Sequence, residues 1–382
     1  MTRRPTAYRV ATVVAVVAML FGNLTISHQV HASNLANAVS ARIKPDTVYR
    51  EMRGPYLRLN FDVELKNESA EAVQINYIEM RLFDPDDKIV TRRYMGRNGL
   101  PGPISMLPSD EIPPNGKLYL FNPFPDMELG AIVARVEIRL FHTEGHTELA
   151  FQPEPMPSAS LTRPPLAGVS YIFSGNDLLS HHRRVSLISK PATDLELQHV
   201  TQRYALDFTY LDQVTGDLAN APGASLPDWF GFDAPVLAPA DGVIELVRAD
   251  MPDNTFDANG NRVFTKEFDS YGDNAGLGNF IILRIEATES YLLMSHFRRG
   301  SITTSEGKRV KAGELIGNIG LSGDTAYPHL HIQMQDGVDP IASRPIPIAF
   351  RCVERNGIQV IDGSVDSGDF VANCGATHDL LD

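Results

Sequence analysis

The chain has 382 residues, of which 43% are hydrophobic and 21% are charged. This length allows two domains with separate cores, and the composition is that of a globular protein. The formal net charge of −13 excludes the general basic field that binds nucleic acid, so we expect no nucleic-acid partner.

The first 32 residues have the pattern of an export signal. Three arginines precede an apolar run from Val10 to Phe21, and small residues end the segment at Ala32. The run is short for a membrane span, which needs about 20 residues. We predict a signal peptide over residues 1–32, no stable membrane span after processing, and a location in the periplasm or extracellular space. A retained membrane anchor is the alternative.

Residues 33–152 have the pattern of an all-β domain. Apolar and polar residues alternate from Leu57 to Leu65 and again from Ala134 to Leu140, as in strands with one buried face. The phase of the alternation changes at Ile78, which suggests a bulge. We predict an immunoglobulin-like β-sandwich. It carries no catalytic constellation, so its expected role is that of a spacer or a site for an envelope protein partner.

A proline-rich stretch at residues 153–165 is predicted as a linker to a second β-rich domain at residues 166–348. Residues 349–382 are predicted as a C-terminal tail. Both cysteines, Cys352 and Cys374, lie in this tail. Export would place them in an oxidising compartment, so we predict a disulfide bond between them. Strands of the second domain are predicted at Asn279 to Ile285, Tyr291 to Phe297 and Leu330 to Met334.

The strongest chemical signal is His329-Leu330-His331 in one of these strands. Side chains two residues apart point to the same face of a strand, so two imidazoles would stand side by side on a rigid platform. Such a platform suits one metal ligand and one general base or hydrogen-bond donor. A pair of this kind in isolation is weak evidence for a metal site.

The segments that surround the pair strengthen the signal. They follow in the order Leu237-Ala238-Pro239-Ala240-Asp241-Gly242-Val243-Ile244, Gly278-Asn279-Phe280-Ile281-Ile282-Leu283, Tyr291-Leu292-Leu293-Met294-Ser295-His296-Phe297, and Val310 to Gly323. In this order, over about residues 199–335, the chain resembles the lysostaphin-type (LytM-like) peptidoglycan zinc metallopeptidase family. The resemblance implies a mostly antiparallel β-sheet groove around one Zn²⁺, and hydrolysis of peptide bonds in peptidoglycan.

The resemblance also implies roles for four residues. Asp207 and His331 align with zinc ligands of the family, and His296 and His329 align with its catalytic histidines. These roles are chemically reasonable. Zinc makes hydroxide available at neutral pH, one histidine can take a proton from water, and the other can donate to the oxyanion.

The resemblance fails at one ligand position. The family has a histidine ligand four residues before the aspartate, and Arg203 occupies that position here. A guanidinium has no lone pair to offer a metal. We predict His199 as the replacement, with the pair His181-His182 as the alternative source of the third nitrogen. If all three are surface residues instead, the site is degenerate.

The sequence therefore predicts an exported zinc metalloendopeptidase whose partner is a peptidoglycan peptide. One alternative is a catalytically inactive protein of the same fold that acts as a scaffold or activator in the envelope. Another is a structural adhesion or assembly module led by the first domain. Arg203 separates the enzyme from the inactive alternative, because the enzyme needs a third ligand from elsewhere.

Overall fold

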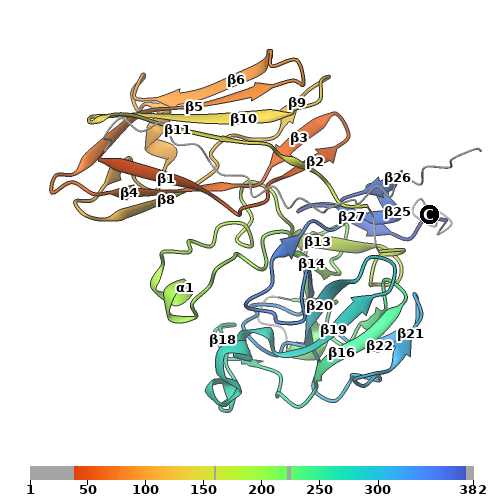
Figure 1. Cartoon of the computed structure of the whole chain (residues 1–382). Coiled ribbons are helices and arrows are strands. Elements are labelled where there is room, and N and C mark those ends of the chain that lie inside the picture. The colour runs from red at the N-terminus through yellow and green to blue at the C-terminus, as the bar shows by residue number, and fades with distance from the viewer. Residues whose placement is uncertain (1–37, 159–160, 222–224, 376–382) are drawn as a thin grey trace, which may run out of the picture.

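The computed structural model describes residues 38–158, 161–221 and 225–375. The protein is mainly β, and its strands form two domains with separate hydrophobic cores (Figure 1). The predicted export signal at residues 1–32 lies outside the described residues. Within the described ranges, no helix combines the length and the apolar character that a bilayer span requires.

Three sheets build the N-terminal domain. Their strand orders are β1-β4-β8, then β11-β10-β5-β6 with β7 beside β5, and β12-β2-β3-β9. The strands are β1 (Val39–Lys44), β2 (Tyr49–Arg53), β3 (Tyr56–Leu59), β4 (Asp62–Asn67), β5 (Val73–Phe83), β6 (Ile89–Gly96), β7 (Glu111–Ile112), β8 (Lys117–Phe121), β9 (Met127–Glu128), β10 (Arg135–His142), β11 (Gly145–Phe151) and β12 (Glu154–Pro155). Inward-facing side chains of these sheets share one core.

Two local predictions for this domain can be compared with the strands. The predicted bulge is confirmed: β5 pairs Tyr77 with Phe141 and Ile75 with His142, so one residue of β5 is skipped. The alternation from residue 57 to 65 was expected to be one strand, but it forms β3 and β4 with a break at Asn60. The side chain of Asn60 is fully buried and bonds to the second domain, which explains the break.

One large sheet dominates the second domain, in the order β21-β16-β19-β20-β23-β14-β13-β27-β25-β26, with β24 beside β23. The predicted strands of this domain are present as β19, β20 and β23. The elements are β13 (Ser170–Ser174), α1 (Lys190–Asp194), β14 (Leu206–Thr209), β15 (Pro235–Leu237), β16 (Gly242–Arg248), β17 (Thr255–Phe256), β18 (Arg262–Val263), β19 (Asn279–Ile285), β20 (Ser290–Phe297), β21 (Arg309–Val310), β22 (Leu315–Asn318), β23 (Leu330–Gln335), β24 (Pro345–Ile346), β25 (Phe350–Arg355), β26 (Ile358–Gly363) and β27 (Phe370–Ala372).

The segment after residue 349 is not a separate tail. Its strands β25, β26 and β27 extend the large sheet, and β27 pairs with β13. The disulfide bond between Cys352 and Cys374 joins β25 to the residues that follow β27. The proline-rich stretch is also packed against its surroundings, since β12 pairs with β2 and Leu161 forms a bridge with Phe350.

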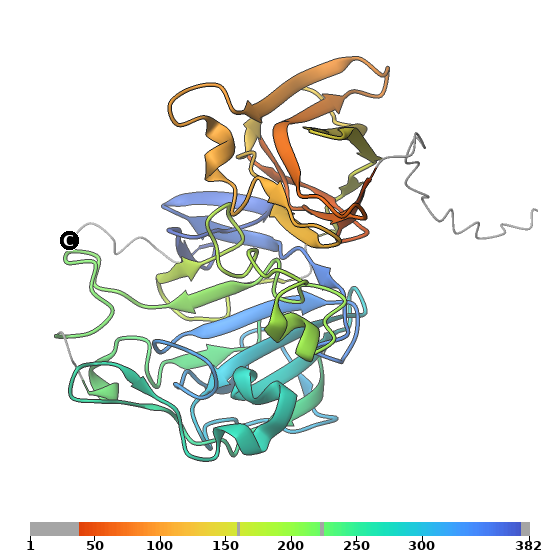
Figure 2. The same ribbon diagram turned by 90° about the vertical axis from the view of Figure 1, so that its left-hand side faces the viewer.

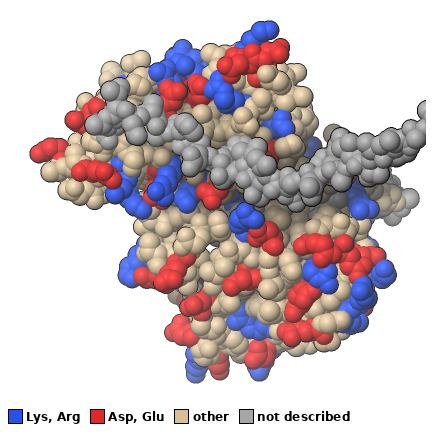
Figure 3. All heavy atoms as spheres, viewed as in Figure 1, with Lys and Arg blue, Asp and Glu red and all other residues tan. Residues whose placement is uncertain are grey.

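The domains are stacked so that the β25–β27 strands and the segment after β13 lie beneath the N-terminal sheets (Figure 2). On the face shown in Figure 3, acidic and basic side chains are interspersed. The strands β20, β23 and β14 are neighbours in the middle of the large sheet. This central position brings the predicted site residues together.

Candidate metal centre

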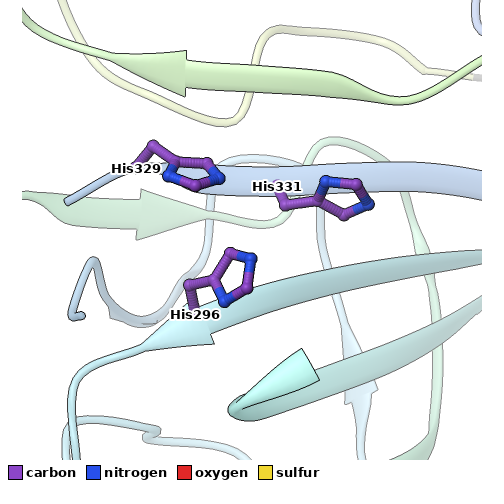
Figure 4. A group of neighbouring side chains, drawn as sticks. All are labelled: His296, His329 and His331. Carbon is purple, nitrogen blue, oxygen red and sulfur yellow. The ribbon is translucent and has the colours of Figure 1, made fainter. Parts of the chain in front are cut away.

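His329 and His331 lie side by side at the start of β23 (Figure 4). Leu330 between them is fully buried in the core on the opposite face of the sheet. The two histidines are themselves only 5% and 6% exposed. The spacing of two residues therefore produces the predicted platform, because successive side chains of a strand alternate between its faces.

Asp207 reaches this platform from the neighbouring strand β14. It is the direct cross-strand partner of His331, and such partners share a face of the sheet. One carboxylate oxygen of Asp207 lies 3.0 Å from Nδ1 of His331 and 3.3 Å from Nε2 of His329. Burial disfavours the ionised form of Asp207, but the neighbouring His182 and His329 hold its pKa well below the usual value. The carboxylate is therefore ionised.

A bulge in β20 brings His296 to the same face. The β19–β20 ladder pairs Asn279 with Phe297 and Phe280 with Ser295, so His296 has no partner. Its φ of +70° is in the left-handed region, which is uncommon for a residue other than glycine. A bulge re-aims the side chain of the extra residue. The ring of His296 consequently faces that of His329, with 4.8 Å between the ring centres (Figure 4).

His182 supplies the nitrogen on the other side of Asp207. Its Nε2 lies 3.2 Å from the second oxygen of Asp207, and both side chains are almost completely buried. His182 stands in the turn after β13, and β13 pairs with β14 on the side opposite to β23. The adjacent His181 is exposed, with Nδ1 3.2 Å from the hydroxyl of Ser174. Of the two predicted sources, the structure thus brings the His181-His182 pair to Asp207.

The structure does not bring His199 to this cluster. His199 lines a separate cavity of about 310 Å³ together with Tyr49, Asp336 and Arg344. A role for His199 as a ligand requires a loop between residues 199 and 203 that brings its side chain to the site. In the structure, His199 lies instead beside residues of the N-terminal domain. Another cavity, of about 880 Å³ and lined by Arg50 and Arg351 among others, contains none of these histidines.

Arg203 also points away from the metal ligands. Its guanidinium is buried, forms an ion pair with Asp62 of the N-terminal domain, and donates to Oδ1 of Asn60 at 2.9 Å. Tyr119 donates to the same carboxylate at 2.9 Å. The arginine at the family's ligand position is therefore neutralised within the domain interface and does not place a cation beside the candidate ligands.

A chain of hydrogen bonds determines which nitrogen of His331 carries the proton. Gln335 donates to the backbone carbonyls of Gly337 and Asp339, so its own amide oxygen accepts from Gln333. The amide oxygen of Gln333 then accepts from Nε2 of His331 at 3.1 Å. Nε2 of His331 is therefore the donor in this chain, and Nδ1 is the nitrogen that faces Asp207. Sequence reasoning missed both glutamines, although their spacing of two after His331 puts them on the same face of the strand.

The same logic applies to His182. Its Nδ1 lies 3.2 Å from the carbonyl oxygen of Gly175, and a carbonyl can only accept a hydrogen bond. Nδ1 is thus the donor of this bond, and Nε2 is the nitrogen that faces Asp207. Two imidazole nitrogens and an ionised carboxylate therefore converge in one buried cluster, an arrangement in which a metal ion can be held.

His296 and His329 have a different arrangement. Nδ1 of His296 donates to the carbonyl of Ser322 at 2.8 Å, and Nδ1 of His329 donates to that of Tyr327 at 2.9 Å. Nδ1 is thus the nitrogen that donates to the backbone in both rings. Burial, followed by repulsion from His329 and His331, holds the pKa of His296 well below the usual value, so this ring is neutral near pH 7 and is able to accept a proton.

The donor set fits zinc. Two neutral imidazoles and one carboxylate are a common set for catalytic zinc, which keeps a further position open. Ligands of tetrahedral zinc at about 2.1 Å from the metal stand roughly 3.4 Å from one another. The observed separations of 3.0 Å from Asp207 to His331 and 3.2 Å from Asp207 to His182 are close to this spacing. His182, Asp207 and His331 would hold the metal.

Comparisons with known proteins find similarities over part of this chain. Residues 230–343 match the model of Peptidase family M23. One similar solved structure is the catalytic domain of the antimicrobial peptidase lysostaphin from Staphylococcus simulans, at 17% identity and a TM-score of 0.25, covering 47% of this chain and 88% of that one. Another is a variant of the catalytic domain of the prophage-encoded M23 protein EnpA from Enterococcus faecalis, at 19% identity and a TM-score of 0.20, covering 36% and 92%. Comparison with curated protein sequences gives no match.

The matched segment contains three of the clustered histidines, His296, His329 and His331, and ends shortly after β23. The candidate ligands His182 and Asp207 precede it, in the part of the chain where the predicted ligand pattern departs from that of the family. The resemblance to lysostaphin-type peptidases predicted from the sequence is thus confirmed by the match of residues 230–343 to the model of Peptidase family M23.

Proposed function

We propose that this protein is an exported zinc metalloendopeptidase that hydrolyses peptide bonds of peptidoglycan in the cell envelope. The observation that supports it best is the convergence of His182 Nε2, His331 Nδ1 and the ionised Asp207 carboxylate in one buried cluster, a donor set that suits zinc. The family match over residues 230–343 supports a peptidase. The basic-apolar-small pattern of residues 1–32 supports export.

A zinc ion, when bound, supplies Lewis acidity that activates water and a peptide carbonyl near neutral pH. The histidines that do not hold the metal supply proton transfer. Nε2 of His296 or His329 accepts a proton from the attacking water and can return it to the leaving amine or donate to the oxyanion. Hydrogen bonds from both Nδ1 atoms to backbone carbonyls hold the rings in the orientation that this transfer requires.

The test combines metal analysis with digestion of a defined substrate. Purified full-length protein should contain about one zinc per chain, and it should release new amino groups from isolated peptidoglycan. The variant His296→Ala is the control, because it should retain zinc and lose most hydrolysis. Wild-type protein that binds zinc but cuts no peptidoglycan peptide would favour a scaffold or activator instead. Protein that binds no zinc would refute the proposal.

A further inference from the structure

The segment that carries His182 is held by the N-terminal domain. It begins with Gly175 and Asn176, directly after β13, and it lies under β3 (Figure 2). Arg58 of β3 donates to the side-chain oxygen of Asn176 at 2.6 Å, and the amide group of Asn176 donates to Glu51 of β2 at 2.9 Å. The side chains of all three residues are buried. The two side-chain partners of Asn176 therefore both come from the other domain.

A single hydrogen bond links the backbone next to Asn176 to the ring of His182, the proposed metal ligand. The carbonyl of Gly175, whose backbone continues into Asn176, accepts the hydrogen bond from Nδ1 of His182. This bond both orients the ring and leaves Nε2 free to face Asp207. A Cβ atom at Gly175 would lie 2.3 Å from a carboxylate oxygen of Asp366, so the backbone is tightly enclosed at this point. Displacement of Asn176 would consequently move the carbonyl that orients His182.

A second contact reaches the other upstream ligand. Arg203 stands at the end of the turn that leads into β14, four residues before Asp207, and it forms the buried ion pair with Asp62 of β4. Breaking a buried pair by removing one partner leaves an uncompensated charge, so such a pair resists separation. The N-terminal domain thus forms buried polar contacts with the chain shortly before His182 and shortly before Asp207.

We propose that the N-terminal domain completes the metal centre, with Arg58 and Asp62 acting as positioning residues for His182 and Asp207. This inference rests on the proposed zinc site. The downstream residues His296, His329 and His331 need no such support, because the β20–β23 ladder places them. The domain predicted to be a spacer is then part of the binding site for the metal.

The test measures zinc affinity in the full-length protein by competition with a chromophoric chelator. Asn176→Ala removes the side-chain bonds of this residue to Arg58 and Glu51 and leaves the backbone of the turn in place. Residues that orient a ligand typically contribute 10–100-fold to metal affinity, so we expect zinc binding to weaken by about that factor. Arg58→Met should weaken zinc binding at least as much, because it also removes the ion pair between Arg58 and Asp366.

Asn67→Ala is the matched control. Asn67 is fully buried, and its amide donates to three backbone carbonyls within the N-terminal domain. Its loss should lower the stability of that domain and leave zinc affinity unchanged. Thermal melting of each variant separates the two effects. Should Asn176→Ala fail to fold, Asn176→Ser, which keeps a polar group near Arg58, is measured in its place.

The outcomes separate this inference from the proposed function. Wild-type zinc affinity in folded Asn176 and Arg58 variants would overturn the inference and leave the metallopeptidase proposal intact. Equal weakening by Asn67→Ala would also overturn it, because a general loss of stability would then explain the result. Wild-type protein that binds no zinc would overturn both.

Discussion

The two halves of the candidate site are built in different ways. His296, His329 and His331 come from two adjacent strands, and their positions follow from strand spacing and one bulge. His182 and Asp207 come from a turn and a strand that are anchored to another domain through Asn176 and Arg203. Local structure determines the positions of the three downstream histidines, whereas contacts between segments distant in sequence determine those of His182 and Asp207. Substitutions in the two halves should therefore have different effects.

The largest expected effect is at His331, where the two halves meet. His331→Ala removes one of two nitrogen ligands and the cross-strand partner of Asp207. Two remaining ligands are too few to hold zinc in a protein site, so metal content should fall to background and hydrolysis should be lost. Elemental analysis after dialysis measures this. A His331→Ala protein that still contains one zinc per chain would contradict the assignment of ligands.

The upstream half is tested by comparing His182→Ala with His199→Ala. His182→Ala should reduce zinc binding almost as severely as the loss of His331, because its Nε2 faces Asp207. His199→Ala should bind zinc like the wild type, since His199 lines a different cavity. Isothermal titration with zinc compares the two variants under the same conditions. The reverse ranking would restore the ligand predicted from the sequence.

Removal of a proton-transfer group should have a smaller effect on metal binding than on rate. His329→Ala deletes a ring whose Nδ1 is bonded to a backbone carbonyl and whose Nε2 lies 3.3 Å from Asp207. General acid–base catalysis typically contributes 10²–10⁴-fold, so kcat should fall by about that factor while one zinc per chain is retained. Loss of the metal in this variant would show that His329 is a ligand.

The smallest expected effect is on the pH dependence of the free energy of unfolding, through the buried carboxyl group of Glu51 at the domain interface. Burial raises the pKa of Glu51 from 4.5 to about 7, despite the lowering by Arg58 and Arg183. Because the pKa is higher in the folded state, Glu51 contributes stability that is complete below pH 4.5 and is lost as the pH rises through 7. Glu51→Gln, which keeps an acceptor for Asn176, should lack this loss.

Urea unfolding of metal-free protein at pH 5 and pH 8 measures this prediction. Relative to Glu51→Gln, the wild type should lose free energy of unfolding on the order of 2–3 kcal/mol between these pH values. The exposed Glu71 offers a control, since Glu71→Gln should differ from the wild type equally at both pH values. A constant difference for Glu51→Gln would show that Glu51 is already ionised at pH 5.

Sequence reasoning was most successful where the structure is local. It predicted strands β19, β20 and β23 to within about one residue, because apolar runs of this length are typical of strands that are buried within a sheet. It recognised Asp207 and the three downstream histidines from ordered motifs. Their proximity in the structure follows from the pairing of β14, β23 and β20.

The errors arose where distant segments meet. The role of Arg203 depends on Asp62, which is 141 residues away, and no spacing rule connects the two. The preference for His199 over His182 rested on its nearness to Arg203 in the sequence, whereas the structure reaches Asp207 from the turn after a different strand, β13. The segment after residue 349 was interpreted as a tail around the two cysteines, and the partners of its strands lie at the far end of the domain.

The pairing of β13 with β27 has a consequence for the order of assembly. Ser170 bonds to Val371 across 201 residues of sequence, and the turn with His182 begins just after β13. Contacts between such distant segments form late, because the long loop must close first. The edge of β13 that pairs with β27 therefore stays open until the C-terminal strand has folded against it, whereas the opposite edge can already pair with β14. The enclosure of the His182 turn is thus one of the last steps in the folding of this domain.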